Sequence, residues 1–204
     1  MPLAAVVGGQ FGGEGKGAIT AYLVVQDKVE ILIKTGGPNS AHTFGKNGQI
    51  MRVRMVPCGA NFGPSTIVYP AGCLIHLETL FFEIRELNYT GQILIDPRAG
   101  IVENSHIEEQ RQDSFYHHAG STLTGTGAAT AARSRRRLRL AKDEPMLASF
   151  VGDTMLFLVN ALEAGKTVLI EGSQSFGLSN YHGDYPYTTS GSTGNGVALD
   201  ECSA

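Results

Sequence analysis

The segment from Gly8 to Gly17 carries the residue types of a phosphate-binding loop. Six of its ten residues are glycine, and Lys16 stands beside the last of them. An apolar run, Leu3 to Val7, precedes it and a helix is expected to begin near Lys16, so backbone N–H groups, the helix dipole and the lysine charge can together hold phosphate. Gln10 and Gly17 depart from a standard Walker A motif. A tight turn without a ligand is the alternative, but so many glycines cost chain entropy.

A second polar loop, residues 35–43, also follows an apolar run and contains His42. A histidine titrates near neutral pH, so His42 could donate to a phosphate oxygen or act as a general acid. A single histidine is more often structural, and this loop alone leaves both interpretations open.

Two further loops offer groups to polar ligands. Residues 120–127 supply hydroxyl and N–H groups, and five of the ten arginines follow between Arg133 and Arg139. Such a cluster is usually a solvated helix face and less often a nucleic-acid surface. Farther along, the amide of Gln174 and the hydroxyls of Thr188 and Thr189 suit a polar ligand, with ordinary turn chemistry as the alternative.

Short apolar runs bounded by Gly, Pro or Asp predict the strands that position these loops: Leu3–Val7, Ile31–Ile33, Thr66–Tyr69, Ile93–Ile95 and Thr167–Ile170. Apolar residues at helical spacing between Leu77 and Leu87, and more loosely between Met146 and Leu162, predict helices. The alternation predicts one α/β domain over residues 1–204, with a mostly parallel central sheet, helices on both faces and a phosphate-loop-like N-terminus. Ligands of such sheets lie at the carboxyl ends of the strands, where these loops are expected.

Composition excludes several classes of protein. Hydrophobic residues make up 42% and charged residues 17%, and no apolar run approaches the ~18 residues of a membrane span, so neither a disordered nor a membrane-spanning chain is expected. The net charge of −3 argues against general coating of nucleic acid. The N-terminus lacks a secretory pattern, which predicts a cytoplasmic protein. Cys58, Cys73 and Cys202 are widely spaced without a CxxC pair, so we expect buried or idle thiols.

Taken in order, the loops resemble one family. They are similar to the N-terminal half to two thirds of adenylosuccinate synthetase. The motifs that carry this similarity are GGQFGGEGKG after a strand, GGPNSAHT, a PCG turn at Pro57 to Gly59, GSTLTGTGAA with an Arg-rich helix, and EGSQSFGLSNYHGDYPYTTS. Five motifs in the right order are highly specific. The sequences of these motifs are most similar to those of short archaeal forms and of phage relatives that use deoxyguanylate in place of inosinate. A polar loop at residues 188–196 with only eight residues after it suggests that the chain lacks the family's C-terminal part.

The resemblance implies a ligase. In the family, the γ-phosphate of GTP, or of ATP in phage relatives, phosphorylates a purine 6-oxygen with Mg²⁺ present, and the amine of L-aspartate then displaces that phosphate. The family match assigns the triphosphate to Gly12, Gly13, Glu14, Gly15, Lys16, Gly17, Ala41, His42 and Thr43. Among these, Lys16 and His42 are catalytic, and the backbone of Gly13 and Ala41 lies near Mg²⁺. The purine monophosphate is assigned to Asn39, Ser121, Thr122, Gln174, Thr188 and Thr189, and to Arg136 reaching across a homodimer interface.

Two positions depart from the family pattern. An aspartate that removes the purine N1 proton and helps to hold Mg²⁺ is replaced by Gly13, and a glycine that approaches Mg²⁺ is replaced by Ala41. Loss of the carboxylate opens space beside the N1–C2 edge of the purine, where guanine carries an amino group. Gly13 therefore favours a guanine-type acceptor or an inactive copy of the enzyme. The sequence leaves open whether the acceptor is IMP or dGMP and whether the phosphate donor is GTP or ATP.

Two other functions are weighed against the ligase. A non-catalytic nucleotide-binding module is favoured by Gly13 and the early end of the chain. A nucleic-acid-binding protein that uses the arginine cluster is weakened by the acidic balance elsewhere and by the lack of interleaved aromatic residues. We therefore expect small-molecule nucleotides as partners, and neither nucleic acid nor a membrane.

Overall fold

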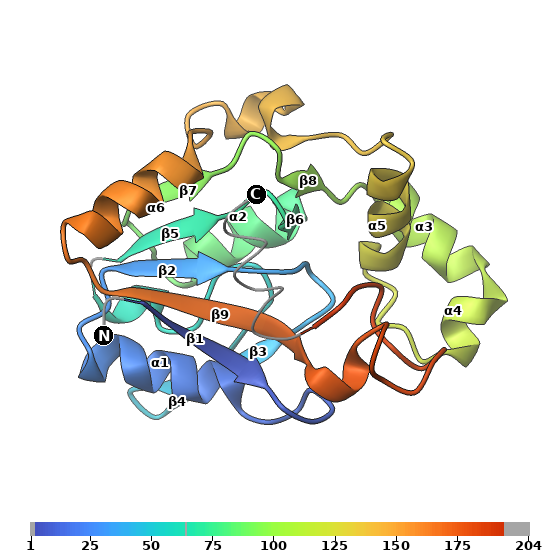
Figure 1. The fold of residues 1–204 in the computed structure, drawn as a ribbon, viewed down its shortest axis with the longest axis horizontal. Coiled ribbons are helices and arrows are strands. Elements are labelled where there is room, and N and C mark those ends of the chain that lie inside the picture. The colour runs from blue at the N-terminus through green and yellow to red at the C-terminus, as the bar shows by residue number, and fades with distance from the viewer. Residues whose placement is uncertain (1–2, 64, 194–204) are drawn as a thin grey trace.

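The computed structural model describes residues 3–63 and 65–193. Among these residues, a five-stranded parallel sheet forms the centre of the molecule, in the order β1-β9-β2-β5-β7 (Figure 1). Its strands are β1 (Leu3–Gly8), β2 (Ile31–Lys34), β5 (Thr66–Tyr69), β7 (Ile93–Ile95) and β9 (Val168–Ser175). Because β9 lies between β1 and β2, the segments that follow these three strands emerge side by side.

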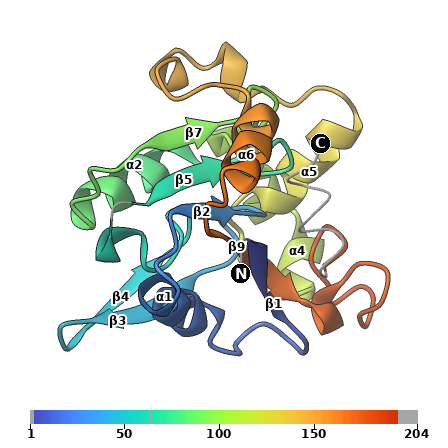
Figure 2. The same cartoon turned by 60° about the vertical axis from the view of Figure 1, so that its left-hand side comes forward.

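Helices cover both faces of the sheet (Figure 2). They are α1 (Lys16–Gln26), α2 (Leu77–Glu86) and α6 (Thr154–Glu163). Val24 of α1 and Leu80 of α2 belong to the same buried cluster as Leu32, whereas Leu158 of α6 packs with Ile31 and Ile33. Successive side chains of a strand point to opposite faces, so β2 alone shows that α6 lies opposite α1 and α2.

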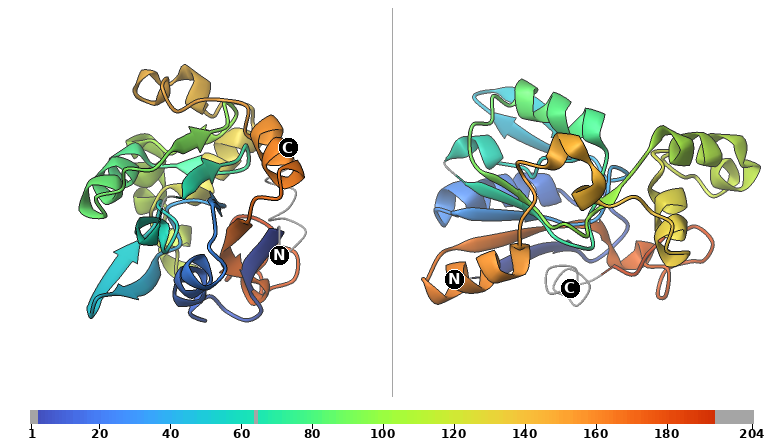
Figure 3. Two further views of the ribbon diagram at one scale, coloured as in Figure 1. Left: turned by 90° about the vertical axis from the view of Figure 1, so that its left-hand side faces the viewer. Right: turned by 90° about the horizontal axis from the view of Figure 1, so that it is seen from above.

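The remaining elements are a hairpin, a short parallel pair and a group of helices: β3 (His42–Lys46), β4 (Gln49–Val53), β6 (Leu74–Ile75), β8 (Gly100–Ile101), α3 (Asn104–Gln112), α4 (Ser114–His118) and α5 (Thr126–Ser134). Helices α3, α4 and α5 gather beyond the carboxyl ends of the sheet strands, as Figures 1 and 3 show from two directions. The strand ends and this helical group therefore frame the space between them. Within the described residues, no helix combines the length and apolar character needed to span a membrane.

The predicted fold class is confirmed, as are the strands expected at β1, β2, β5 and β7 and the start of α1 at Lys16. The expected end of the last strand at Ile170 is wrong, because β9 continues to Ser175. Glu171 pairs with Val6 on one side and with Lys34 on the other, and Ser175 pairs with Gly8. Pairing with β2 reaches Glu171, and pairing with β1 resumes at Ser175 after an irregularity, so neighbouring strands hold this polar stretch in the sheet.

Two expected helices are shorter than predicted. Met146 lies in a separate 3₁₀ turn, and α6 begins only after Asp153, whose carboxylate accepts the N–H of Leu156 at 2.9 Å as a helix cap. The expected Arg-rich helix is also wrong, since α5 ends at Ser134 and Arg136 has a φ of 59°. A left-handed backbone at that position cannot continue a right-handed helix, so most of the arginine cluster lies in an irregular segment.

Candidate nucleotide-binding site

The segments that follow β1, β2 and β9 surround two adjoining open pockets at the carboxyl ends of the strands. The first, about 860 Å³, lies over the strand ends and is lined by Gly8, Thr35 and Ser173 among others. The second, about 1070 Å³, lies toward α4 and is lined by Ser121 and Thr122. Crevices at this edge of parallel sheets are the usual ligand sites of α/β proteins.

The phosphate loop runs from β1 to the first turn of α1. Gly15 precedes the helix with a φ of 81°, a conformation that favours glycine. Gly17 packs so closely that a Cβ there would come within 2.8 Å of the Cys58 sulfur and of the Thr43 carbonyl oxygen. This contact explains the glycine at the position where a Walker motif has Ser or Thr. The first N–H groups of α1 have no acceptor inside the helix, which makes them candidates for holding an anion.

Lys16 is the buried cation of this loop. Its side chain is 4% exposed, and its Nζ donates to the Gly12 carbonyl oxygen at 2.9 Å and to the Ser175 hydroxyl at 3.2 Å. Burial lowers the pKa of Lys16, while the carboxylates of Glu14 and Glu171 oppose that effect. A phosphate group at the loop would supply the counter-charge that these neutral partners do not.

Glu14 holds the loop in shape. Its carboxylate accepts the N–H groups of Gly9 and Gln10 at 2.9 Å and of Gly12 at 3.3 Å. The hydroxyl of Ser175 donates to the same carboxylate and lowers the pKa of Glu14. These three N–H groups are therefore engaged by Glu14, and the N–H groups at the start of α1 are the better candidates for holding phosphate.

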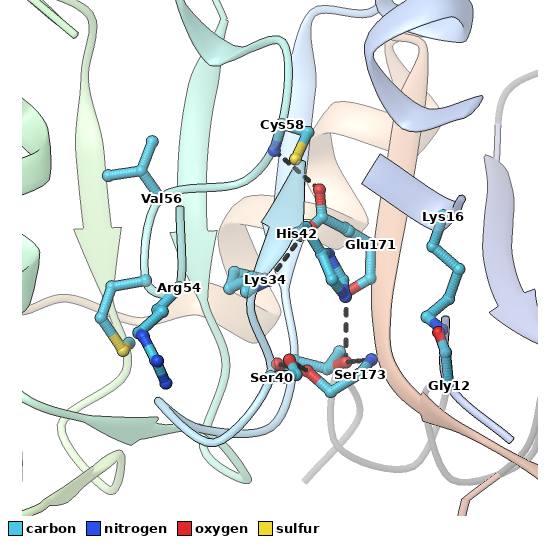
Figure 4. Close-up of polar contacts among 12 residues, drawn as sticks. Gly12, Lys16, Lys34, Ser40, His42, Arg54, Val56, Cys58, Glu171 and Ser173 are labelled. Carbon is cyan, nitrogen blue, oxygen red and sulfur yellow. Dashed lines mark hydrogen bonds and ion pairs between the residues drawn. The ribbon is translucent and has the colours of Figure 1, made fainter. Parts of the chain in front are cut away.

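His42 lies beside the phosphate loop in a buried ionic network that also includes Lys34 and Glu171 (Figure 4). A Cβ on Gly17 would meet the His42 Cβ at 2.9 Å, so the histidine packs against the first turn of α1. Its Nδ1 bonds to Glu171 Oε1, and Lys34 Nζ donates to that same oxygen at 2.6 Å. The N–H of Cys58 donates to Glu171 Oε2 at 2.7 Å.

Burial and charge act in opposite directions inside this network. Burial would raise the pKa of Glu171, but the Lys34 charge and the His42 hydrogen bond outweigh it and hold that pKa far below its usual range. Burial works against the charge of Lys34, but the carboxylate outweighs it and raises the pKa of the ammonium. Burial, followed by the Lys34 charge, lowers the pKa of His42. The ion pair is therefore charged and the imidazole is neutral at neutral pH.

Sequence reasoning missed Lys34 and gave Glu171 no role. A signal was present, because each charge directly follows an apolar run: ILIK in β2 and VLIE within β9. Only the pairing of β2 with β9 brings these residues opposite each other, and they lie 137 positions apart in the chain.

The second pocket collects the residues that the sequence predicted for the acceptor nucleotide: Asn39, Ser121, Thr122, Gln174, Thr188 and Thr189. Asn39 Nδ2 donates to the Thr189 hydroxyl at 3.4 Å, which ties the β2 loop to the last described loop. Gln174 has a φ of 64° at the end of β9 and lines both pockets. Strained backbone of this kind clusters at functional sites, and here it lies where the pockets meet.

Other predicted residues lie apart from this pocket. Gly13 is exposed, and a Cβ added there would meet nothing within 4 Å. Ala41 directly precedes His42, and Thr43 is exposed on β3. Arg136 is exposed and lines neither pocket, whereas Arg133 of α5 lines the first and donates to the Ala71 carbonyl oxygen at 2.8 Å.

The thiols agree with the expectation of buried cysteines where the structure describes them. Cys58 and Cys73 are buried, and burial followed by the Glu171 charge raises the pKa of Cys58. The prediction for Cys202, and the end of the polar loop at residues 194–196, lie outside the described residues.

Comparison with known proteins gives a consistent picture. The family model for adenylosuccinate synthetase matches residues 5–143 and 139–202. The adenylosuccinate synthetase of Thermococcus sibiricus is 40% identical over 198 residues, which are 95% of this chain and 58% of that protein. That of Pyrococcus horikoshii is 39% identical over 206 residues, or 98% and 61%. The chain thus spans about three fifths of the length of these relatives.

Two solved structures share the fold. A fully ligated adenylosuccinate synthetase from Plasmodium falciparum superposes with a TM-score of 0.90 at 22% identity, covering 100% of this chain and 59% of that one. The cyanophage S-2L succinoaminodeoxyadenylate synthetase, bound to dGMP and to dATP as an energy donor, superposes with a TM-score of 0.87 at 28% identity, covering 98% and 59%.

Proposed function

The chain belongs to the adenylosuccinate synthetase family, and we propose that it forms part of a ligase that joins L-aspartate to carbon 6 of a purine nucleoside monophosphate. In the first step the purine 6-oxygen attacks the γ-phosphorus, the bond to the β-phosphate oxygen breaks, and a nucleoside diphosphate leaves. The purine N1 proton passes to solvent. In the second step the aspartate nitrogen attacks carbon 6, inorganic phosphate leaves with the 6-oxygen, and the nitrogen loses a proton.

The observation that carries this proposal is the junction of two different kinds of site at one sheet edge. Lys16, His42 and the start of α1 form a cationic, partly buried site suited to a triphosphate. The adjoining pocket around Gln174 offers neutral amides and hydroxyls suited to a nucleotide's base, sugar and phosphate. A ligase that transfers a phosphoryl group between two nucleotides needs both sites in contact.

His42 and Lys16 have different roles toward the transferred phosphoryl group. Lys16 supplies a charge-assisted hydrogen bond to the phosphate oxygens. The Nδ1 of His42 is engaged by Glu171, so Nε2 is the ring nitrogen that faces substrate chemistry. A protonated His42 donates from Nε2 and stabilises the negative charge that develops during transfer.

Magnesium fits this chain as an ion that arrives with the triphosphate. Gly13 has no side chain and Ala41 offers only its backbone carbonyl, while the Glu14 carboxylate is occupied by N–H groups and by Ser175. Mg²⁺ commonly keeps several waters and binds through substrate phosphates with few protein ligands. Here the Gly13 and Ala41 carbonyls would hold it, and the ion would neutralise phosphate charge.

The acceptor is a 2-aminopurine nucleotide such as dGMP. In the family match Gly13 replaces an aspartate beside the purine N1–C2 edge, and the open space around its Cβ position supports this assignment, because an added carboxylate would compete there with a guanine 2-amino group. The dGMP bound by the similar cyanophage enzyme supports it as well. That enzyme's energy donor also makes ATP a donor to test beside GTP.

Arg136 serves the acceptor phosphate of a second subunit in a homodimer. Its exposed position outside both pockets of its own chain supports this role. Arg136→Ala is expected to weaken monophosphate binding about tenfold, as for loss of a charge-assisted hydrogen bond, without unfolding the chain. Sedimentation with dGMP present should reveal dimers of the parent, and a strictly monomeric species would contradict the shared site.

Phosphate release tests the proposed activity on the 204-residue chain. MgATP or MgGTP, L-aspartate and dGMP or IMP are combined and then omitted one at a time. Release that requires all three substrates supports the ligase. Nucleotide binding without any such release would favour the second candidate, a non-catalytic nucleotide-binding module, to which the missing carboxylate at Gly13 points.

A further inference from the structure

Gln110 is a buried amide that the proposed function does not yet use. Its side chain, on α3, is 2% exposed and lines the second pocket. Its Oε1 accepts the N–H of Gly125 at 2.5 Å, directly before the first turn of α5. A buried amide needs partners at both of its ends, because an unpaired polar atom away from water is costly. The partner of the nitrogen therefore decides what this amide does.

The nitrogen of this amide lies beside Tyr116 of α4. An N–H can only donate, so the contact with Gly125 places the oxygen of Gln110 on that side and its NH₂ group on the other. A Cβ added to Gly127 would meet Gln110 Nε2 at 2.8 Å and the Tyr116 hydroxyl oxygen at 3.5 Å, and the amide is a hydrogen-bond partner of that hydroxyl. Because the NH₂ group cannot accept, the tyrosine oxygen accepts from it.

The proton of the Tyr116 hydroxyl is left for another acceptor. Burial, followed by the charges of Glu109 and Asp113, raises the pKa of Tyr116, so the hydroxyl keeps its proton at neutral pH. Within the described part of the chain, this hydroxyl donates to no acceptor. Tyr116 lines the second pocket, so its proton is available to a molecule bound there.

The surroundings of Tyr116 favour the phosphate end of a nucleotide. The described residues that line the second pocket are all uncharged, so an anion bound there depends on neutral donors of this chain. The carbonyl oxygen of Tyr116 accepts the N–H of Ser121 at 2.9 Å, which places α4 against the turn that carries the Ser121 and Thr122 hydroxyls.

The orientation of the acceptor nucleotide follows from the chemistry at its other end. Its purine 6-oxygen must reach the γ-phosphate near Lys16, and Lys16 does not line the second pocket. The monophosphate, at the opposite end of the molecule, then lies toward α4, beyond the ends of the strands (Figure 1).

We propose that Tyr116 binds the monophosphate of the acceptor nucleotide and that Gln110 is its positioning residue: the amide accepts from Gly125, donates to the tyrosine oxygen, and so directs the hydroxyl proton to a phosphate oxygen. Ionised phosphate oxygens are strong acceptors, which matches a hydroxyl that is left only to donate. The inference rests on the proposed function only in naming the nucleotide.

The first test is Tyr116→Phe, which removes the hydroxyl and keeps the ring. We expect the affinity for dGMP, measured by titration calorimetry, to fall about tenfold, while the affinity for MgATP stays at the parental value. Tyr22→Phe is the matched control, because Tyr22 is an exposed tyrosine of α1 that lines neither pocket of the site, and it should bind dGMP like the parent. Unchanged dGMP affinity in folded Tyr116→Phe overturns the inference.

The second test, Gln110→Glu, reads the direction of the hydrogen bonds. A carboxylate still accepts the Gly125 N–H, but it can only accept, so the tyrosine proton then goes to the new carboxylate and not to the phosphate. Tyr116→Phe should therefore weaken dGMP binding about tenfold in the parent, and by less than about twofold when it is combined with Gln110→Glu. Equal effects of Tyr116→Phe in the two backgrounds overturn the positioning role of Gln110.

The third test replaces the nucleotide with inorganic phosphate and uses the parent chain, so it stands even where Gln110→Glu does not fold. NMR spectra with isotope-labelled tyrosine rings follow Tyr116, whose signal is assigned by its loss in Tyr116→Phe. Phosphate should shift this signal and leave that of Tyr22 unmoved. A Tyr116 signal that responds to neither phosphate nor dGMP overturns the inference. A response to phosphate without any binding of dGMP or IMP would support the inference and contradict the proposed function.

Discussion

The two halves of the candidate site, the phosphate loop with its ionic network and the acceptor pocket around Gln174, consist of different kinds of side chains. The phosphate-loop half has charged side chains that are almost fully buried, with Lys16 at 4%, Lys34 at 1% and Glu171 at 0% exposure. The acceptor half has uncharged groups on loops, joined by contacts as long as the 3.4 Å between Asn39 and Thr189. The first half is fixed by strands and ion pairs before any ligand binds, whereas the second is held by neutral hydrogen bonds between loops, and we expect it to be the more adaptable half. In the proposed function the γ-phosphate is transferred at the rigid half, and the acceptor nucleotide binds in the adaptable half.

Glu171→Gln should break the rigid half most severely. The change leaves Lys34 buried without a counter-charge, and loss of one partner of a buried ion pair typically costs ~3–5 kcal/mol. The free energy of unfolding, measured with urea, should fall by about this amount at pH 7. Glu30→Gln is the control, because the Glu30–Lys166 pair is half exposed and should contribute less than ~1 kcal/mol. Equal effects of the two changes would contradict the account.

The same carboxylate predicts a pH dependence. The pKa of Glu171 in the folded chain lies below its unfolded value, so its stabilisation is fully present above the unfolded value near 4.3 and is lost as the pH falls from there toward the folded value. Urea titrations between pH 7 and pH 3 should therefore show a loss of stability below about pH 4 that is smaller in Glu171→Gln.

Lys16→Ala should separate the two halves. Loss of a charge-assisted hydrogen bond to phosphate is expected to weaken triphosphate binding by ~1.5–3 kcal/mol, while dGMP binding in the acceptor pocket changes little. Titration calorimetry with each nucleotide measures both. Lys28→Ala, an exposed lysine just beyond α1, serves as the control for charge. An unchanged triphosphate affinity would remove Lys16 from the site.

Gly13→Asp should sharpen the difference in specificity. The new carboxylate enters open space and competes with a guanine 2-amino group, so the preference should shift from dGMP toward IMP by ~1–3 kcal/mol. Binding curves for both nucleotides measure the ratio. Gly13→Asn, which matches the shape without the charge, separates crowding from electrostatics. A parent that prefers IMP, with a ratio that Gly13→Asp leaves unmoved, would show that Gly13 does not set specificity.

Thr189→Val should have the smallest effect. It removes one neutral hydroxyl from the adaptable half, so dGMP affinity is expected to fall by ~0.5–1.5 kcal/mol, and Thr189→Ser should restore it. Triphosphate affinity should stay at the parental value. A larger loss for the triphosphate than for dGMP would mean that the two subsites have been assigned in the wrong order.

Sequence reasoning reached the loops more readily than the network between them. The run Leu3–Val7 followed by glycines and Lys16 predicts strand, turn and helix from local pattern alone, and the structure has β1 and α1 in those places. No local sequence pattern connects Lys34 with Glu171, because their contact depends on which strands become neighbours. The continuation of β9 to Ser175 was missed for the same reason: polar residues are held in the sheet there by pairing with β2 up to Glu171 and with β1 up to Ser175.

The arginine cluster illustrates a different limit. Its composition favours a helix with a charged face, but the backbone turns left-handed at Arg136 and α5 ends at Ser134. Arg133 instead reaches carbonyl oxygens of the β5–β6 connection. Tertiary contacts of this kind override local propensity.

The central claim is that two nucleotides bind side by side, one on the phosphate loop and one in the pocket around Gln174. The direct measurement is a calorimetric titration of dGMP into the chain, alone and saturated with a non-hydrolysable ATP analogue and Mg²⁺. The account predicts one dGMP per chain in both titrations, with an affinity that is equal or higher when the analogue is bound. Displacement, in which the apparent affinity for dGMP falls in proportion to the analogue concentration, would mean a single shared phosphate site and would contradict the account.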